Sequence, residues 1–421
     1  MTSALQGLAM RFGPALTRVS ENVYLSAIRA GMVSIAPLTI IGGFFLILSN
    51  FPLPGWEDRV KPYANLLQIP VTATFGMLGL FACFFVAYDF AKQLKQEAVN
   101  SAAIATIIFL LINIDSKTQS LVTENLGSKG LFTAIVIALI SVRVQKFFTD
   151  KNLVIKLPAS VPAVVYESFL SLVPMTFLII VFWGVRHLAN IDINNFIQLA
   201  FQPVVFALNT LPGILVYALF VTMLWSIGIN GDNTMDAIVA PIFLKYLADN
   251  VTAFTNHQPV PYITAYGFFT TFVNVGGTGA TIALALIMVT SREASFRKIS
   301  RLSLPTQIFQ INEPIFFGFP IVLNPIFMIP YILNALILTA ASYLLMAGHF
   351  ISRPVINIPW TTPPIIGHFL ATNGDWRAAV WGFFSILIAM AVYYPFAKAA
   401  ERQRLIAEAQ KSAATELKAA N

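Results

Sequence analysis

Stretches without a charged side chain constrain the fold of this chain more than any other feature of its sequence. They lie at 30–56, 62–88, 98–114, 193–231, 250–291, 314–352 and 378–397. A membrane span needs about 20 mostly apolar residues, and a charge inside hydrocarbon costs roughly 2.5–3.5 kcal/mol on insertion scales. These stretches therefore predict membrane spans, as do the segments 131–148 and 168–185. Several stretches exceed one span, so they must contain helix pairs or re-entrant segments.

The composition supports the same conclusion. Only 11% of the 421 residues are charged and 57% are hydrophobic, whereas a soluble domain carries about 25% charged residues. So few charges could not cover the surface of soluble domains, and about ten spans would use most of the chain. The single Cys83 excludes an internal disulfide and a cysteine-based zinc site.

The basic residues predict how the spans are oriented. They precede the first span, follow the second and fourth spans, cluster over 292–301 and fill the tail after 397, whereas the loops at 50–70 and 115–129 carry balanced charge. Because cytoplasmic loops carry an excess of Lys and Arg, this alternation places both termini in the cytoplasm. The net charge of +7 thus reflects membrane topology, and without a basic patch with interleaved aromatic residues it does not predict nucleic-acid binding.

The organisation changes along the chain. After residue 207, glycine, proline, asparagine and isolated acids interrupt the apolar stretches, as in GINGDN (228–233), NVGGTGAT (274–281), QINEP (310–314) and PWTTPP (359–364). Non-helical backbone at membrane depth survives only where it is buried in protein or lines a cavity, and transporters build substrate sites there. We therefore predict an N-terminal cytoplasmic helix (1–25), a scaffold of about five spans (26–190), an amphipathic connector (191–210), a substrate domain (211–397) and a cytoplasmic tail (398–421).

Glu313 is the strongest candidate for a chemical role. It is the only charged residue between Arg301 and Arg353, and Pro305 and Pro314 indicate that this segment is not one straight span. An acid at this depth must be neutral, paired or facing water, and such residues are usually functional. The alternative is a structural carboxylate that ties a loop to backbone donors.

The segment 228–237 carries Asp232 and Asp236 beside two asparagines and two glycines. Its hydrogen-bonding groups suit a sugar, which presents many hydroxyls. The alternative is a helix start with Asp232 or Asn233 as N-cap, and both interpretations can hold together.

Two further segments have both a functional and a structural interpretation. The glycine run at 276–279 allows close backbone approach, either to a ligand or to another helix, and it lacks the residues of a phosphate-binding loop. Trp360 could stack on a sugar ring or anchor the chain at the membrane interface. The four histidines show no metal-ligand spacing, so we predict neither a metal site nor a cofactor.

These segments resemble a known family. The sequences AIRAGMVSIAPLTIIGG (27–43), IKLPASVPAVVYESF (155–169), LWSIGINGDN (224–233), GGTGAT (276–281), SLPTQIFQINEPIFFGFPIVLNP (303–325) and NIPWTTPP (357–364) are similar to the lactose/diacetylchitobiose family of EIIC components. These are the membrane-embedded subunits of the bacterial phosphoenolpyruvate:sugar phosphotransferase system. The similarity covers essentially residues 10–400, and FQINEP is its most specific part.

The resemblance implies an all-α polytopic protein of the bacterial cytoplasmic membrane. It would be a homodimer with about ten transmembrane helices and two re-entrant hairpins per subunit. The first half would dimerise, and the second half would hold a disaccharide and move like an elevator. A separate EIIB protein, itself phosphorylated through EIIA, would donate a phosphoryl group from a phosphocysteine to the sugar 6-hydroxyl. Cys83 lies in the apolar run LFACFFV and cannot be that cysteine.

The resemblance also implies roles for individual residues. Glu313 would contact the sugar and assist phosphotransfer, Asn312 would hydrogen-bond the sugar and Trp360 would pack on it. Backbone approach would come from Gly277 and Gly279. Asn230, Gly231 and Asp232 would complete the substrate site, with Asn230 holding the reacting hydroxyl. One position departs from the family, which usually has GIHG where this chain has GING (228–231). Asn230 can donate and accept hydrogen bonds but cannot titrate near neutral pH.

The main hypothesis is therefore a sugar permease that couples entry of a β-linked disaccharide to its 6-O-phosphorylation. Cellobiose, diacetylchitobiose and lactose are the candidate substrates. A rival is a sugar facilitator or secondary transporter without phosphotransfer, which Asn230 favours and the resemblance disfavours. A membrane sensor would need a signalling domain that the sequence does not contain.

Overall fold

The structure, a computed structural model, describes residues 21–51, 54–155, 158, 163–319 and 321–420. Nearly all of this part of the chain is helical, and its only β-type pairing is one isolated bridge between Ile114 and Leu121. The N-terminal helix predicted over 1–25 falls largely outside the described residues.

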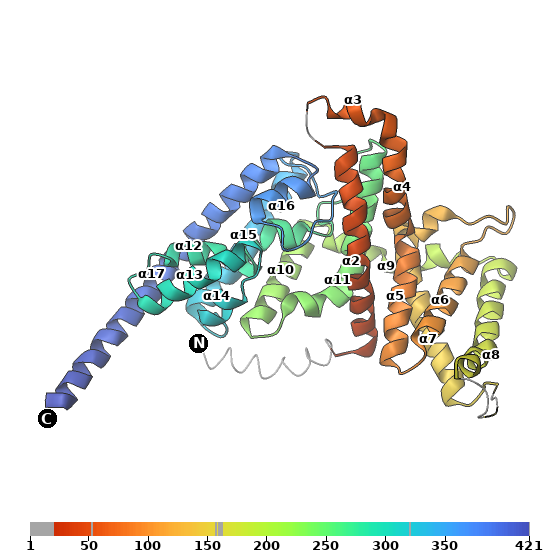
Figure 1. The fold of residues 1–421 in the computed structure, drawn as a ribbon, viewed down its shortest axis with the longest axis horizontal. Helices are drawn as coiled ribbons and strands as arrows, with labels where there is room; N and C mark the ends of the chain where they lie inside the picture. Colours follow the sequence, from red (N-terminus) through yellow and green to blue (C-terminus); the bar gives the residue numbers. More distant parts are fainter. Residues whose placement is uncertain (1–20, 52–53, 156–157, 159–162, 320, 421) are drawn as a thin grey trace.

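Most helices of the first half stand side by side, and the short helix over 56–60 lies across the end of this group (Figure 1). They are α2 (Val23–Ser49), α3 (Trp56–Val60), α4 (Ala64–Thr74), α5 (Leu78–Gln93), α6 (Ala98–Ile112), α7 (Leu131–Asp150), α8 (Ala163–Trp183) and α9 (Ile193–Leu208). Small residues let these helices approach closely, as expected of helix packing in membranes. At Gly31 of α2, for example, a Cβ atom would lie 2.5 Å from the Val86 side chain of α5.

The second half combines long helices with short and bent pieces (Figure 1). They are α10 (Leu211–Ser226), α11 (Gly231–Thr255), α12 (Ile282–Met288), α13 (Ala294–Ile308), α14 (Glu313–Gly318), α15 (Pro325–Ala347), α16 (Pro364–Ala371) and α17 (Trp376–Ala420). The chain bends by 80° between α9 and α10, and by 46° between Phe268–Ala280 and α12.

Among the described residues, seven helices are long and apolar enough to cross a membrane, or up to nine if each bent pair counts as one span. Four of the seven, together with the shorter apolar helix α6, fall in the region predicted to hold about five spans. This confirms the all-helical polytopic fold, whereas the number of ten spans stays a prediction.

Acidic residues at the edges of the charge-free stretches serve as helix N-caps. The Glu97 carboxylate accepts hydrogen bonds from Val99 N at 3.1 Å and Asn100 N at 2.5 Å, and so begins α6. Asp192 accepts from Asn195 N at 3.1 Å and begins α9. A cap of this kind is worth about 1 kcal/mol. These charges therefore define helix ends outside the spans.

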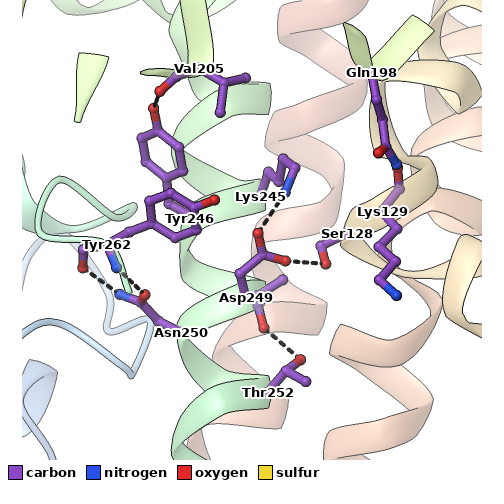
Figure 2. Close-up of polar contacts among 11 residues, drawn as sticks. Ser128, Lys129, Gln198, Val205, Lys245, Tyr246, Asp249, Asn250, Thr252 and Tyr262 are labelled. Atoms are coloured by element: carbon purple, nitrogen blue, oxygen red, sulfur yellow. Dashed lines mark hydrogen bonds and ion pairs between the residues drawn. The ribbon is translucent and has the colours of Figure 1, made fainter. Parts of the chain in front are cut away.

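Polar contacts join the two halves. The Asp249 carboxylate of α11 accepts a hydrogen bond from Ser128 Oγ of the first half at 2.5 Å, and it pairs with Lys245 Nζ at 2.5 Å (Figure 2). We call these three residues the Asp249 cluster. Elsewhere on this boundary, Asn357 Nδ2 donates to Thr39 Oγ1 of α2 at 2.7 Å. These polar contacts supplement the packing of the second half against the first, since buried hydrophobic residues of both halves belong to one core.

The last helix extends well past the membrane-embedded body. α17 has 45 residues, which corresponds to a length of about 68 Å, more than twice the ~30 Å thickness of the hydrocarbon layer. It is continuous through residue 398, where we predicted the tail to begin, so the tail is the projecting end of the last helix (Figure 1).

Candidate functional site

The FQINEP segment lies between α13 and α14 and is hydrogen-bonded to the glycine-rich segment 276–281. Gln310 Oε1 accepts from Gly276 N at 2.6 Å and from Gly277 N at 3.1 Å. Gln310 has a φ of +66°, so the chain turns sharply before the acid. Its side chain is mostly buried and provides the acceptor for Gly276 N, whereas Gly277 N also donates to Asn274 O at 3.0 Å.

Asn312 completes this connection. Its Nδ2 lies 3.0 Å from Thr278 O, 3.1 Å from Thr278 Oγ1 and 3.0 Å from Thr281 Oγ1. An amide nitrogen carries only two hydrogens, so these acceptors fully occupy it. No described residue donates to the Asn312 Oδ1, which remains available as an acceptor. We refer to the contacts of Gln310 and Asn312 with 276–281 as the amide clamp.

The glycines at 277 and 279 are required by the amide clamp and its surroundings. Gly277 has a φ of +105°, and a Cβ atom there would lie 2.4 Å from Asn312 Cβ. Gly279 has a φ of +67°, and its Cβ would lie 2.2 Å from the Tyr331 ring. In this structure their freedom therefore serves internal packing, which is the structural alternative given by the sequence. Gly279 O also accepts a hydrogen bond from Tyr393 OH at 2.9 Å.

Glu313 is the first residue of α14 and its side chain is exposed. Its carboxylate makes no hydrogen bond or ion pair with any described residue, whereas the acids Glu97, Asp192 and Glu293 all cap helices. The neighbouring Ile315 and Phe316 are fully buried and fix the backbone of α14. The site therefore presents one uncommitted carboxylate on a firmly packed segment.

The GINGDN segment forms the corner between α10 and α11. Asn230 caps α11, because its Oδ1 accepts from Asn233 N at 2.9 Å. The predicted cap at Asp232 or Asn233 is therefore wrong, since both lie inside the first turn. Gly231 packs so closely on α10 that a Cβ atom would lie 2.1 Å from Val221 O. The Asn230 side chain is exposed, and no described residue accepts from its Nδ2.

Asp232 ties this corner to the rest of the second half. Its Oδ2 accepts from Trp225 Nε1 at 2.8 Å, and its carboxylate also interacts with Asn274, just before the glycine-rich segment. The Trp225 ring lies 5.3 Å from the Phe316 ring of α14, centroid to centroid. The structure thus brings together three of the predicted segments: 228–233, 274–281 and 310–314.

Trp360 stands apart from these contacts. Its side chain is 60% exposed, and the turn that holds it is closed by a hydrogen bond from Thr362 N to Pro359 O at 2.9 Å. Within the described ranges, no hydrogen bond or ring contact joins Trp360 to the other three segments. A role for Trp360 at a sugar site stays a prediction.

Sequence reasoning missed Gln310 and Trp225 as parts of the site. A signal for Gln310 was available, because this amide lies three residues before Glu313, the only charge between Arg301 and Arg353. Trp225 gave no such signal, since tryptophan is common in membrane helices and its partner Asp232 is known only from the structure.

The comparison with known families identifies the class of protein. The family model for "Phosphotransferase system, EIIC" matches residues 29–335 of this chain. The chain therefore belongs to the EIIC family of the phosphotransferase system, whose members are membrane-embedded sugar permease components, and the resemblance noted from the sequence is confirmed.

Individual relatives show which members of the family this chain is similar to. The chain is 33% identical to the lichenan permease IIC component of Bacillus subtilis (strain 168), covering 96% of this chain and 95% of the relative. It is also 33% identical to a cellobiose-specific EIIC component of Geobacillus stearothermophilus, with coverages of 97% and 96%. Among solved structures, it resembles the transporter ChbC, the IIC component of the N,N'-diacetylchitobiose-specific phosphotransferase system. That match has a TM-score of 0.90 and 32% identity, with coverages of 95% and 99%.

Proposed function

We propose that this chain carries a β-linked disaccharide of the cellobiose, diacetylchitobiose or lactose type across the bacterial cytoplasmic membrane and couples entry to 6-O-phosphorylation by phospho-EIIB. The names of the relatives support this class of sugar, because they concern cellobiose, lichenan and diacetylchitobiose. The basic segments support an orientation with both termini in the cytoplasm.

The observation that carries the proposal is the uncommitted carboxylate of Glu313 beside the amide clamp. In the reaction, the phosphorus–sulfur bond of the EIIB phosphocysteine breaks and a phosphorus–oxygen bond forms at the sugar 6-oxygen. Glu313 would accept the hydroxyl proton, and the cysteine leaves as a thiolate. Phosphoryl transfer depends mainly on positioning and on handling of charge. A carboxylate with no other partner suits that task.

The other residues would bind and orient the sugar. Asn312 Oδ1 would accept a hydrogen bond from a sugar hydroxyl, since Asn312 Nδ2 already donates to Thr278 O and Thr281 Oγ1. Asn230 would donate from Nδ2 to the reacting hydroxyl, while Oδ1 caps α11. Trp360 would stack on a sugar ring. Gly231, Asp232, Gly277 and Gly279 would shape the site through their close packing.

The phosphoryl donor would lie on a separate chain. Cys83 is fully buried in α5, so it is inaccessible to EIIA and to the sugar. We propose that EIIB supplies the phosphocysteine and that EIIA recharges it. Two copies of this chain would associate through the first half, and the second half would move the sugar like an elevator.

The test uses proteoliposomes with a labelled disaccharide outside and phospho-EIIB inside. We expect sugar phosphate to accumulate inside at a rate that depends on phospho-EIIB. Equal sugar flux with and without phospho-EIIB, and no sugar phosphate, would contradict the proposal.

The second candidate function is facilitated sugar transport without phosphotransfer, and Asn230 is the observation that favours it. An Asn230→His substitution restores the titratable group that the family usually has at this position. If the chain is a phosphotransferase component, we expect this variant to form sugar phosphate faster. If it is a facilitator, both forms should transport sugar without phosphorylation.

A further inference from the structure

The junction of α12 and α13 is fixed to the projecting part of α17 through one buried carboxylate. Glu401 Oε1 accepts from Ser291 Oγ and from Arg292 N, both at 2.6 Å, and its Oε2 pairs with Lys398 Nζ at 2.8 Å. Only 6% of Glu401 is exposed. The guanidinium of Arg404 also lies over the Phe296 ring of α13, 5.6 Å from its centroid. The two segments therefore form one rigid surface.

Two acids at this surface, Glu293 and Glu401, are used internally. Glu293 caps α13 through Ser295 N at 3.1 Å and Phe296 N at 2.6 Å. Burial raises the pKa of Glu293, but these backbone hydrogen bonds outweigh that effect and leave the pKa below its usual range. Glu401 is occupied as described above. Glu401 pairs with Lys398, and neither acid forms an ion pair with an arginine in the described part of the chain.

Besides Arg404, the exposed cations of these two segments are Arg292, Lys298, Arg301 and Arg402. None of the four forms an ion pair with an acid in the described part of the chain. We call them the cationic platform. Between Arg292 and Arg402 lies a cavity of about 520 Å³ whose lining includes Leu405 and Ile406. The platform thus combines unpaired positive charge with a hollow whose lining is partly charged and partly apolar.

The platform lies outside the hydrocarbon layer yet close to the candidate site. The charge-free stretch 378–397 accounts for one span of about 20 residues, so Arg402 lies beyond it. On the other side, α13 leads directly into the amide clamp and Glu313. Its 15 residues correspond to a length of about 22 Å. A protein bound to the platform would therefore lie about one helix length from the reacting carboxylate.

We propose that the cationic platform is the docking surface for an acidic face of the soluble phosphoryl-carrier protein EIIB. This inference rests on the proposed function and adds where the donor binds. The platform and Glu313 belong to the same half of the chain. A bound donor would therefore keep its position relative to the sugar if that half moves. The positive charge of the platform also attracts a phosphoryl group, which carries about −1.5 to −2 charge at neutral pH. This attraction raises the rate at which phospho-EIIB associates with the chain.

An anionic lipid surface is the other class of partner with complementary charge. Two features favour a protein. The platform is held rigid by the Glu401 contacts, and it includes a hollow on a helix that projects away from the membrane-embedded body (Figure 1). Attraction to a fluid lipid surface requires only nearby cations.

The test measures binding of purified EIIB from the same organism to the full chain in nanodiscs of zwitterionic lipid. The variant is Arg301→Glu with Arg402→Glu. The matched control is Lys92→Glu with Lys95→Glu, which reverses two exposed cations at the end of α5 in the first half. We expect the platform variant to weaken EIIB binding at least about tenfold, with a steep salt dependence in wild type, and the control to change it less than about twofold.

A thermal-shift measurement of disaccharide binding shows whether each variant is folded. We expect the disaccharide affinity to be the same in wild type and in both variants. An unchanged EIIB affinity in the platform variant, or an equal loss in both variants, would overturn the proposal. So would an effect seen only in nanodiscs that contain anionic lipid. Because this assay measures binding, it remains informative if wild type forms no sugar phosphate, a result that would reject the proposed function instead.

Discussion

Interrupted helices distinguish the second half of this protein from the first, although polar side chains cap helices in both halves. In the first half, polar side chains such as Asn22 and Glu97 cap long helices at their ends, and close packing is between apolar faces. In the second half, polar side chains lie where helices are interrupted, and Gln310 and Asn312 bond one broken segment to another. Regular helices satisfy their own backbone groups, whereas interrupted ones need side chains to do so. A substrate site therefore fits the second half.

Glycine shows the same contrast. Gly31 in α2 has ordinary helical backbone, and its missing side chain allows α5 to approach. Gly277 has a left-handed φ of +105° and is packed against the amide of Asn312. The first glycine stabilises a scaffold, and the second permits a backbone shape that only glycine adopts easily. Substitutions in the two halves should therefore have different consequences.

The largest effect is expected from Glu313→Gln. The amide keeps the size and hydrogen-bonding capacity of the side chain but cannot accept a proton. Sugar-phosphate formation should fall about 100-fold or more, as is typical when a general base is lost, while disaccharide affinity should change little. The measurement is initial phosphorylation rate and thermal-shift affinity in one preparation. Full activity in this variant would refute the proposed role of Glu313.

Alanine at the two glycines compares the halves directly. Gly277→Ala should weaken disaccharide binding strongly, because the new methyl group displaces Asn312 and the backbone is strained by about 1–3 kcal/mol. Gly31→Ala should lower the unfolding temperature through overpacking of about 1–3 kcal/mol without altering the affinity of the folded protein. Disaccharide titrations at fixed temperature separate the two effects. Similar losses of affinity in both variants would remove the distinction between the halves.

Gln310→Leu should raise the KM for the disaccharide, because it leaves Gly276 N without an acceptor, while Gly277 N keeps only Asn274 O. An unsatisfied buried donor costs about 1–3 kcal/mol. Gln310→Glu keeps an acceptor oxygen and should restore most of the affinity. Transport assays over a range of sugar concentrations provide the measurement. If the leucine and glutamate variants have the same KM, Gln310 does not position the glycine-rich segment.

The smallest losses of stability are expected from two ion pairs within helices, one near the contact between the halves and one in the first half. Asp249→Asn removes the ion pair with Lys245, whose side chains are 21% and 15% exposed, and should cost about 1 kcal/mol of stability. Asp150→Asn removes the pair with Lys146 in the first half, where the same spacing occurs at 52% and 27% exposure, and should have almost no effect. Thermal unfolding of both variants checks this. A larger loss of stability in Asp150→Asn would contradict the expectation that the more buried ion pair contributes more.

The sequence predicted the helical membrane fold because hydrocarbon excludes charge, so the gaps between charges mark the spans. It also predicted the family through FQINEP and the neighbouring motifs. The amide clamp was not predictable, since the contact of Gln310 with Gly276 joins residues that are 34 positions apart. The helix cap was misplaced because Asn230, Asp232 and Asn233 are all good capping residues, and only the packing of Gly231 on α10 decides between them.

The central claim is that the second half holds the sugar beside Glu313. The most direct measurement is a cryo-EM structure of the chain with bound cellobiose or diacetylchitobiose. The account predicts density for the sugar within hydrogen-bonding distance of the Glu313 carboxylate and of Asn312 Oδ1. Density for the sugar among the helices of the first half, or in the second half without contact to Glu313, would contradict it.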